Sequence, residues 1–161
     1  SGSWGYYRDE QSWKSVDQLL KMLIDSVSMG GNLLLNVGPT GRGEFDERAY
    51  DRLRGIGKWM KRHSRSIYGC TQAPLEFECP KDCRLTYNPE TQRLYVHMYS
   101  WPFGKLRLTG ELAEHVEYIQ ILSDASELQF SYNADQRIVD IPLPIYKPMN
   151  ADIPVLEIFL K

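Results

Sequence analysis

The chain of 161 residues has few cysteines and no second cysteine pair, which limits both disulfide and metal chemistry. Its three cysteines are Cys70, Cys79 and Cys83, and an odd number argues against a disulfide framework. Cys79 and Cys83 have the spacing of half a zinc site, but the sequence contains no matching second pair. We therefore expect no metal and no cofactor. Buried or reduced thiols are typical of cytoplasmic proteins, although the compartment itself is left open.

The chain also lacks an excess of charge of either sign and any long hydrophobic run. Nineteen Lys and Arg against 21 Asp and Glu give a net charge of −2, without the basic clusters that bind nucleic acid or anionic membranes. No apolar run approaches the roughly 20 residues that span a bilayer. The composition, 42% hydrophobic and 25% charged, is that of an ordinary globular protein. We expect neither a nucleic-acid partner nor a membrane partner.

Two helical patterns occupy much of the first half. Ser15 and Gln18 form a capping-box pattern, and Gly30 is placed to end the first helix. Its apolar positions recur at helical spacing and form one stripe: Val16, Leu19, Leu20, Leu23, Ile24 and Val27. The second helix is predicted to start near Asp46, where a carboxylate is favourable to the helix dipole. Its expected buried face comprises Ala49, Leu53, Ile56 and Met60.

Between these helices runs Gly30-Gly31-Asn32-Leu33-Leu34-Leu35-Asn36-Val37-Gly38-Pro39-Thr40-Gly41-Arg42-Gly43. Leu33–Leu35 leave no polar face, which predicts a strand covered on both sides, as in parallel sheets. One strand cannot make a parallel sheet, so we expect this chain to begin partway into a longer protein. The glycine-rich end fits neither the Walker pattern nor the dinucleotide pattern. It predicts a tight turn rather than a phosphate site.

From about residue 71 the pattern changes to alternation of apolar and polar residues. Strands near 85–87 and 94–98 flank the turn signal Asn88-Pro89-Glu90-Thr91, which predicts a hairpin. A turn is also predicted at Gly110. Further strands are predicted near 105–108, 116–122, 128–132, 139–141 and 155–160. Seven or eight short strands at regular spacing indicate an antiparallel sandwich. The chain therefore divides into residues 1–69 and residues 70–161.

Candidate functional residues are few. Trp4-Gly5-Tyr6-Tyr7 is an aromatic cluster outside any periodic element, and it indicates either a sugar-binding loop or a plug at the end of a core. Glycosidase chemistry needs two carboxylates that converge on one bond. The carboxylates of the first half do not form a convincing pair: Asp17 and Asp25 lie on an outward helix face, Asp46 and Glu47 lie at a helix start, and Asp9-Glu10 is followed by polar residues. His63 lies among charged residues near a helix end, and we expect it to be solvated.

Several of these segments resemble the C-terminal part of glycoside hydrolase family 29, the α-L-fucosidases. The resemblance is carried by Trp4-Gly5-Tyr6, by the helix from Ser15 to Gly31 and by the run Gly31–Pro39. It continues through Gly43-Glu44-Phe45-Asp46 and through Ser64-Arg65-Ser66-Ile67-Tyr68-Gly69. It covers the chain in order, although the second half matches in architecture more than in motif.

The resemblance implies a fold and an activity. Residues 1–69 would be an α/β barrel fragment, the last βα units of a (β/α)8-like catalytic barrel, and residues 70–161 an all-β antiparallel sandwich. The family implies a retaining exo-α-L-fucosidase that hydrolyses terminal α-L-fucosides with two carboxyl groups about 5 Å apart. Both carboxyl groups would lie upstream, so this chain holds no catalytic residue and is expected to be inactive alone. Its partners would be the α-L-fucoside and the N-terminal remainder of the barrel.

Trp4 is the one site residue that the resemblance carries over. It matches an aromatic residue that lines the family's pocket near the C6 methyl group of fucose, and Tyr6 would support it. Asn36 would lie behind them at the end of the predicted strand. An alternative of another class is a non-catalytic module that binds glycans or joins subunits through Tyr99, Trp101 and Phe103. Assembly into a homo-oligomer is left open.

Overall fold

Two helices begin and end where the local signals predict, in a computed structural model that describes residues 4–148 and 152–161. Helix α1 spans Val16–Ser28, and its capping box is formed. Gln18 N donates to Ser15 Oγ at 3.2 Å, and Ser15 N donates to Gln18 Oε1 at 2.9 Å. Helix α2 spans Glu47–His63 and is capped by Asp46, whose Oδ1 accepts from Arg48 N at 2.8 Å. A 3-10 turn, η1 (Ser64–Ser66), follows it.

The two helices touch closely at one glycine. A Cβ atom added to Gly55 of α2 would lie 2.5 Å from Cγ2 of Val16, at the start of α1. Real Cβ atoms do not approach so closely, so this contact requires glycine. Gly57 differs, because a Cβ atom there would meet nothing within 4 Å among the described residues.

The second half is antiparallel, as predicted. The described residues form eight strands: β1 (Thr71–Gln72), β2 (Cys83–Asn88), β3 (Arg93–Met98), β4 (Lys105–Thr109), β5 (Val116–Ile121), β6 (Ser131–Asn133), β7 (Ile138–Pro142) and β8 (Val155–Leu160). They make a five-stranded sheet in the order β1-β2-β3-β8-β5 and a three-stranded sheet in the order β4-β7-β6. The β2–β3 hairpin is confirmed, with Leu85 opposite Val96. At Gly110 the prediction of a simple turn is wrong, since a short helix, α3 (Gly110–His115), begins there.

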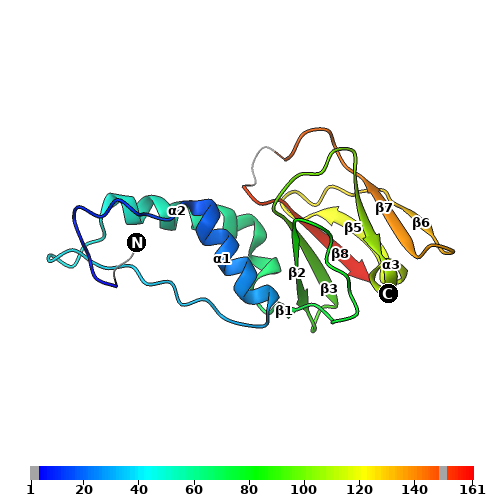
Figure 1. The fold of residues 1–161 in the computed structure, drawn as a ribbon, viewed down its shortest axis with the longest axis horizontal. Helices are drawn as coiled ribbons and strands as arrows, with labels where there is room; N and C mark the ends of the chain where they lie inside the picture. Colours follow the sequence, from blue (N-terminus) through cyan, green and yellow to red (C-terminus); the bar gives the residue numbers. More distant parts are fainter. Residues whose placement is uncertain (1–3, 149–151) are drawn as a thin grey trace.

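The five-stranded sheet is buried on both faces. Leu94, Val96 and Met98 of β3 pack in a core shared with the three-stranded sheet. The intervening Tyr95 packs with α1 and α2, because side chains alternate along a strand. That second core also holds Trp59, whose Nε1 donates to Ile153 O at 2.9 Å. Figure 1 shows the two helices side by side at one end of an elongated molecule and the strands at the other.

The predicted strand at Leu33–Leu35 is wrong for this chain. Residues 31–40, the connecting thread, join no sheet and run from α1 back along the helices toward α2 (Figure 1). Leu34 is 87% exposed. The physical reason is that a strand is defined by hydrogen bonds to its neighbours, and the described chain places no neighbouring strand beside the thread. Within the described residues, Leu34 and Leu35 of the thread are therefore left exposed.

The expectation that His63 is solvated is also wrong. His63 is 1% exposed, its Nδ1 donates to Trp59 O at 2.9 Å, and its ring stacks on Trp59 at a centroid distance of 4.7 Å. The end of α2 turns onto the five-stranded sheet, so a residue that follows a run of charges is carried into the second core. None of the helices in the described ranges is long and apolar enough to cross a membrane.

Candidate functional site

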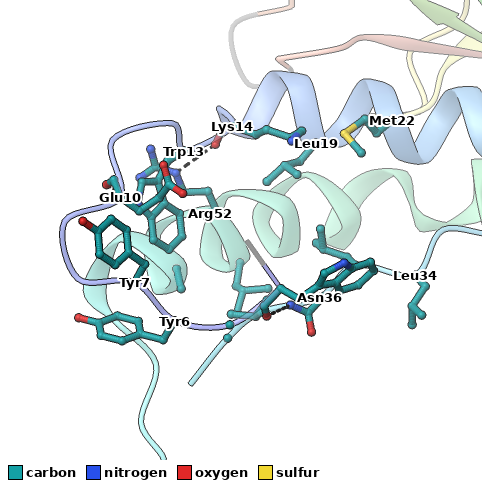
Figure 2. A pocket seen from close by; sticks show the side chains of 17 residues that line it. Tyr6, Tyr7, Glu10, Trp13, Lys14, Leu19, Met22, Leu34, Asn36 and Arg52 are labelled. Atoms are coloured by element: carbon teal, nitrogen blue, oxygen red, sulfur yellow. Dashed lines mark hydrogen bonds between the residues drawn. The ribbon is translucent and has the colours of Figure 1, made fainter. Parts of the chain in front are cut away.

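A cavity of about 460 Å³ lies at the end of the molecule farthest from the sheets, where the N-terminal loop (residues 4–14) meets the thread and both helices (Figure 2). Aromatic side chains of the loop line it, together with apolar side chains of α1, α2 and the thread. Figure 2 shows Tyr6, Tyr7 and Trp13 on the loop side, with Asn36 and Leu34 on the thread. Flat aromatic groups beside a few polar ones are what sugar-binding pockets use.

Trp4, the predicted site residue, lines this cavity with a side chain that is 78% exposed. Its backbone is held even though its indole is open to solvent. Asn36 Nδ2 donates to Trp4 O at 2.7 Å, a contact between residues 32 positions apart (Figure 2). An indole presented in this way can cover an apolar ligand face without moving its own main chain.

Tyr6 is tied to the start of α2. Its hydroxyl donates to Asp46 Oδ2 at 3.4 Å. Hydrogen bonds from Arg48 to the Asp46 carboxyl, with a lesser contribution from Tyr6, lower the pKa of Asp46 to about 2. Asp46 is therefore ionised at neutral pH, which suits a helix cap and does not suit a general acid.

Arg48 joins the N-terminal loop to α2. Its guanidinium makes a bidentate pair with Asp46 at 2.8 Å and donates to Glu10 O and Arg8 O, both at 2.9 Å. It also lies 4.9 Å from the centre of the Trp13 ring, whose Nε1 donates to Glu10 O at 3.1 Å. Sequence reasoning missed this cluster, because Arg48 lies 38 to 40 positions from its loop partners and no local pattern connects them.

The acidic residues of the first half do not form a catalytic pair in the part of the chain that the structure describes. Their ion pairs are with separate bases: Asp17 with Lys21 at 2.9 Å, Asp25 with Arg84 at 2.7 Å and Glu47 with Arg54 at 2.7 Å. Asp17, Asp25 and Glu47 are thus each paired with a different cation.

The three cysteines form no disulfide with one another. All three are free, and burial raises the pKa of Cys70 to about 11 and that of Cys83 to about 12. Such thiols stay protonated and are poor nucleophiles at neutral pH. Across residues 4–148 and 152–161, no group of three or more His, Cys, Asp or Glu is placed to hold a metal ion.

The aromatic residues of the alternative module hypothesis have different surroundings. The Tyr99 hydroxyl donates to Asp25 Oδ1 at 2.9 Å, so it joins the sheet to α1. Trp101 Nε1 donates to Pro144 O at 2.9 Å and holds two loops together. Phe103, on one of these loops, is 94% exposed, and Ile145 and Tyr146 on the other loop are also exposed. This end of the β-rich half presents apolar surface to solvent.

Known proteins similar to this chain include several that are named as α-L-fucosidases. The family model described as alpha-L-fucosidase matches residues 1–65. The plasma α-L-fucosidase of Rattus norvegicus is 33% identical over 149 residues, which are 88% of this chain and 32% of the rat protein. The solved structure of α-L-fucosidase isoenzyme 1 from Paenibacillus thiaminolyticus has a TM-score of 0.87 at 30% identity, over 98% of this chain and 37% of that one. The Thermotoga maritima α-fucosidase in complex with fucose has a TM-score of 0.78 at 28% identity, over 96% of this chain and 37% of that one.

These similarities first identify the class: the chain is related to glycoside hydrolases. Within that class it belongs with the α-L-fucosidases, and the portion of them that it matches is C-terminal. The chain spans about a third of the length of the relatives that it matches.

Proposed function

We propose that this chain is the C-terminal part of a retaining exo-α-L-fucosidase, which removes terminal α-L-fucose together with the polypeptide that the chain does not span. One observation carries the proposal: 98% of the chain superposes on the Paenibacillus thiaminolyticus enzyme at 30% identity, yet accounts for 37% of it. In this proposal residues 1–69 complete a (β/α)8-like barrel and residues 70–161 form an accessory sandwich. The nucleophile and the acid/base residue would belong to the unmatched two thirds.

The exposed state of the connecting thread supports the proposal that further strands pair with it. Leu34 and Leu35 are exposed, and between Leu33 and Val37 the described chain forms no backbone–backbone hydrogen bond. An apolar segment with free N–H and C=O groups on both edges is suited to pair with strands on either side. Barrel strands supplied by upstream polypeptide would satisfy both edges and cover the leucines.

Trp4 is the proposed fucose contact. The indole is exposed at a cavity lined by other aromatic residues, and Asn36 holds its main chain. Fucose presents an apolar methyl group and ring face that an indole can cover. Burial of such a face contributes about 1–2 kcal/mol to binding.

Hydrolysis of an aryl α-L-fucoside tests the proposal. The full-length enzyme should turn the substrate over, and the isolated chain should not. In the full-length enzyme Trp4→Ala should raise KM about 5- to 30-fold, the equivalent of about 1–2 kcal/mol. Tyr132→Ala, an exposed aromatic change in β6, is the matched control and should leave KM unchanged. Turnover by the isolated chain, or a full-length enzyme without α-L-fucosidase activity, would contradict the proposal.

A second candidate function is favoured by the exposed apolar loops of the β-rich half. Phe103, Ile145 and Tyr146 could make that end a glycan-binding or subunit-joining module. In that case the isolated chain should bind fucosylated glycans without turnover, and Trp101→Ala should abolish the binding because it releases the loop held to Pro144 O.

A further inference from the structure

The thread touches the N-terminal loop directly behind Trp4. We infer that Asn36 is a positioning residue, which acts through Trp4 and sets how tightly the enzyme holds the fucosyl group. The inference rests on the proposed function. It goes beyond the resemblance, which places Asn36 behind Trp4 but does not say what its side chain does there.

A hydrogen bond runs from Asn36 Nδ2 to Trp4 O. At 2.7 Å it is at the short end of the range for an N–H···O bond. The carbonyl of Trp4 belongs to the peptide unit that follows its Cα, so holding this oxygen limits rotation of the main chain that carries the indole. The indole itself remains free to meet a ligand, since its side chain is 78% exposed.

The thread also approaches the loop backbone closely two residues further along, at Gly38. A Cβ atom on Gly38 would lie 2.7 Å from Tyr6 N and 2.8 Å from the carbonyl carbon of Gly5. Both neighbours are main-chain atoms and cannot rotate away. Asn36 and Gly38 are two positions apart, so in an extended segment they face the same side. This side of the thread therefore packs against residues 4–6.

The opposite side of the loop is fixed independently. Asp46 accepts from the Tyr6 hydroxyl, and Arg48 donates to the carbonyls of Arg8 and Glu10. These contacts hold residues 6–10 to α2, whereas Asn36 holds the peptide unit of Trp4 itself. Removing the Asn36 donor should thus release the indole while leaving the rest of the loop attached.

Asn36→Asp in the full-length enzyme is the test. The exchange keeps the size of the side chain but replaces the donor by an oxygen that repels the Trp4 carbonyl. We expect KM for an aryl α-L-fucoside to rise about three- to tenfold, as for loss of one hydrogen bond, with kcat changed less than about twofold. Asn133→Asp is the matched control: its Oδ1 accepts from Gln136 N, a bond that aspartate keeps.

A double-mutant cycle distinguishes action through Trp4 from a separate effect. If Asn36 acts through Trp4, Asn36→Asp should have no further effect on KM in a Trp4→Ala background. Additive effects, or an equal fall of kcat and kcat/KM, would overturn the inference while the proposed function stands. An inactive wild-type enzyme would overturn both.

Amide hydrogen exchange on the chain alone gives a readout that does not depend on activity. Asn36→Asp should speed exchange at residues 5–7 relative to both the wild type and Asn133→Asp, with α1 unchanged. Unaltered exchange at those amides would refute the positioning role.

Discussion

At the scale of single residues, two buried histidines have unusual surroundings. His63 donates from Nδ1 to Trp59 O, and Nε2 has no partner among the described residues. The Thr86 hydroxyl donates to Ser66 O, so His97 Nε2 must be the donor in its 3.0 Å contact with Thr86 Oγ1. That leaves His97 Nδ1 without a partner in the described chain. In each ring one nitrogen donates and the other has no described partner, so burial disfavours the doubly protonated, charged form.

Burial lowers the pKa of His63 and lowers that of His97 to about 3. Because these pKa values lie below that of an unfolded histidine, the unfolded chain binds more protons in acid. The free energy of unfolding should fall as pH drops below about 6.5, and His97 alone should account for about 2 kcal/mol of loss at pH 5.

Urea unfolding of the isolated chain at pH 7.5 and pH 5 measures this loss. His97→Gln should reduce the pH dependence, whereas His115→Gln, on the partly exposed helix α3, should preserve it. Equal pH dependence in the wild type and His97→Gln would contradict the assignment.

The residues of the candidate site were only partly predictable from the sequence. The aromatic loop at Trp4 could be recognised, because glycine among aromatic residues outside a periodic element is a local signal. Arg48 and Trp13 could not, since their contacts join segments about 35 to 40 positions apart. The burial of His63 was missed for the same reason: it depends on where the end of α2 meets the sheet.

At the scale of elements, the crossing of α1 and α2 is fixed by a glycine. Gly55→Ala should destabilise the chain by about 1–3 kcal/mol, because the added methyl group would overlap Val16, whose branched side chain has few alternative rotamers. Gly57→Ala on the same helix meets open space and should stabilise it by about 0.5–1 kcal/mol. Denaturant unfolding of the two variants measures both changes. A destabilising Gly57→Ala, or a neutral Gly55→Ala, would count against this packing.

Elements with complete local signals were predicted well. The capping box of α1 and the turn between β2 and β3 need only residues next to them in the sequence. The thread, α3 and β1 were not predicted as they stand. β1 is a two-residue strand defined by its pairing with β2, and the thread lacks the pairing that would make it a strand.

At the scale of the whole molecule, the exposed thread predicts a difference between the isolated chain and the full-length enzyme. Leu34→Lys should change the unfolding free energy of the isolated chain by less than about 0.5 kcal/mol, because Leu34 is already in solvent. In the proposed full-length enzyme the same change would place a charge among the proposed barrel strands and should prevent accumulation of active protein. Soluble yield and fucosidase activity are the measurements.

Leu75→Lys is the control for that experiment, since Leu75 is a similarly exposed leucine in the loop between β1 and β2. It should be tolerated in both forms. A full-length Leu34→Lys enzyme with normal yield and activity would show that upstream polypeptide does not cover the thread.

The two-sided burial of the five-stranded sheet bears on how such proteins can recombine. Leu94, Val96 and Met98 of β3 pack in the core between the two sheets. Tyr95, from the same strand, packs in the core beneath α1 and α2. Separation of the chain between residues 69 and 70 would remove the β-rich half, including Ile153, against which Trp59 of α2 packs. A chimera that joins this helical half to a foreign β-rich half would succeed only if the donor strand also carried side chains shaped for α1 and α2. The two halves should therefore be inherited and exchanged as one unit.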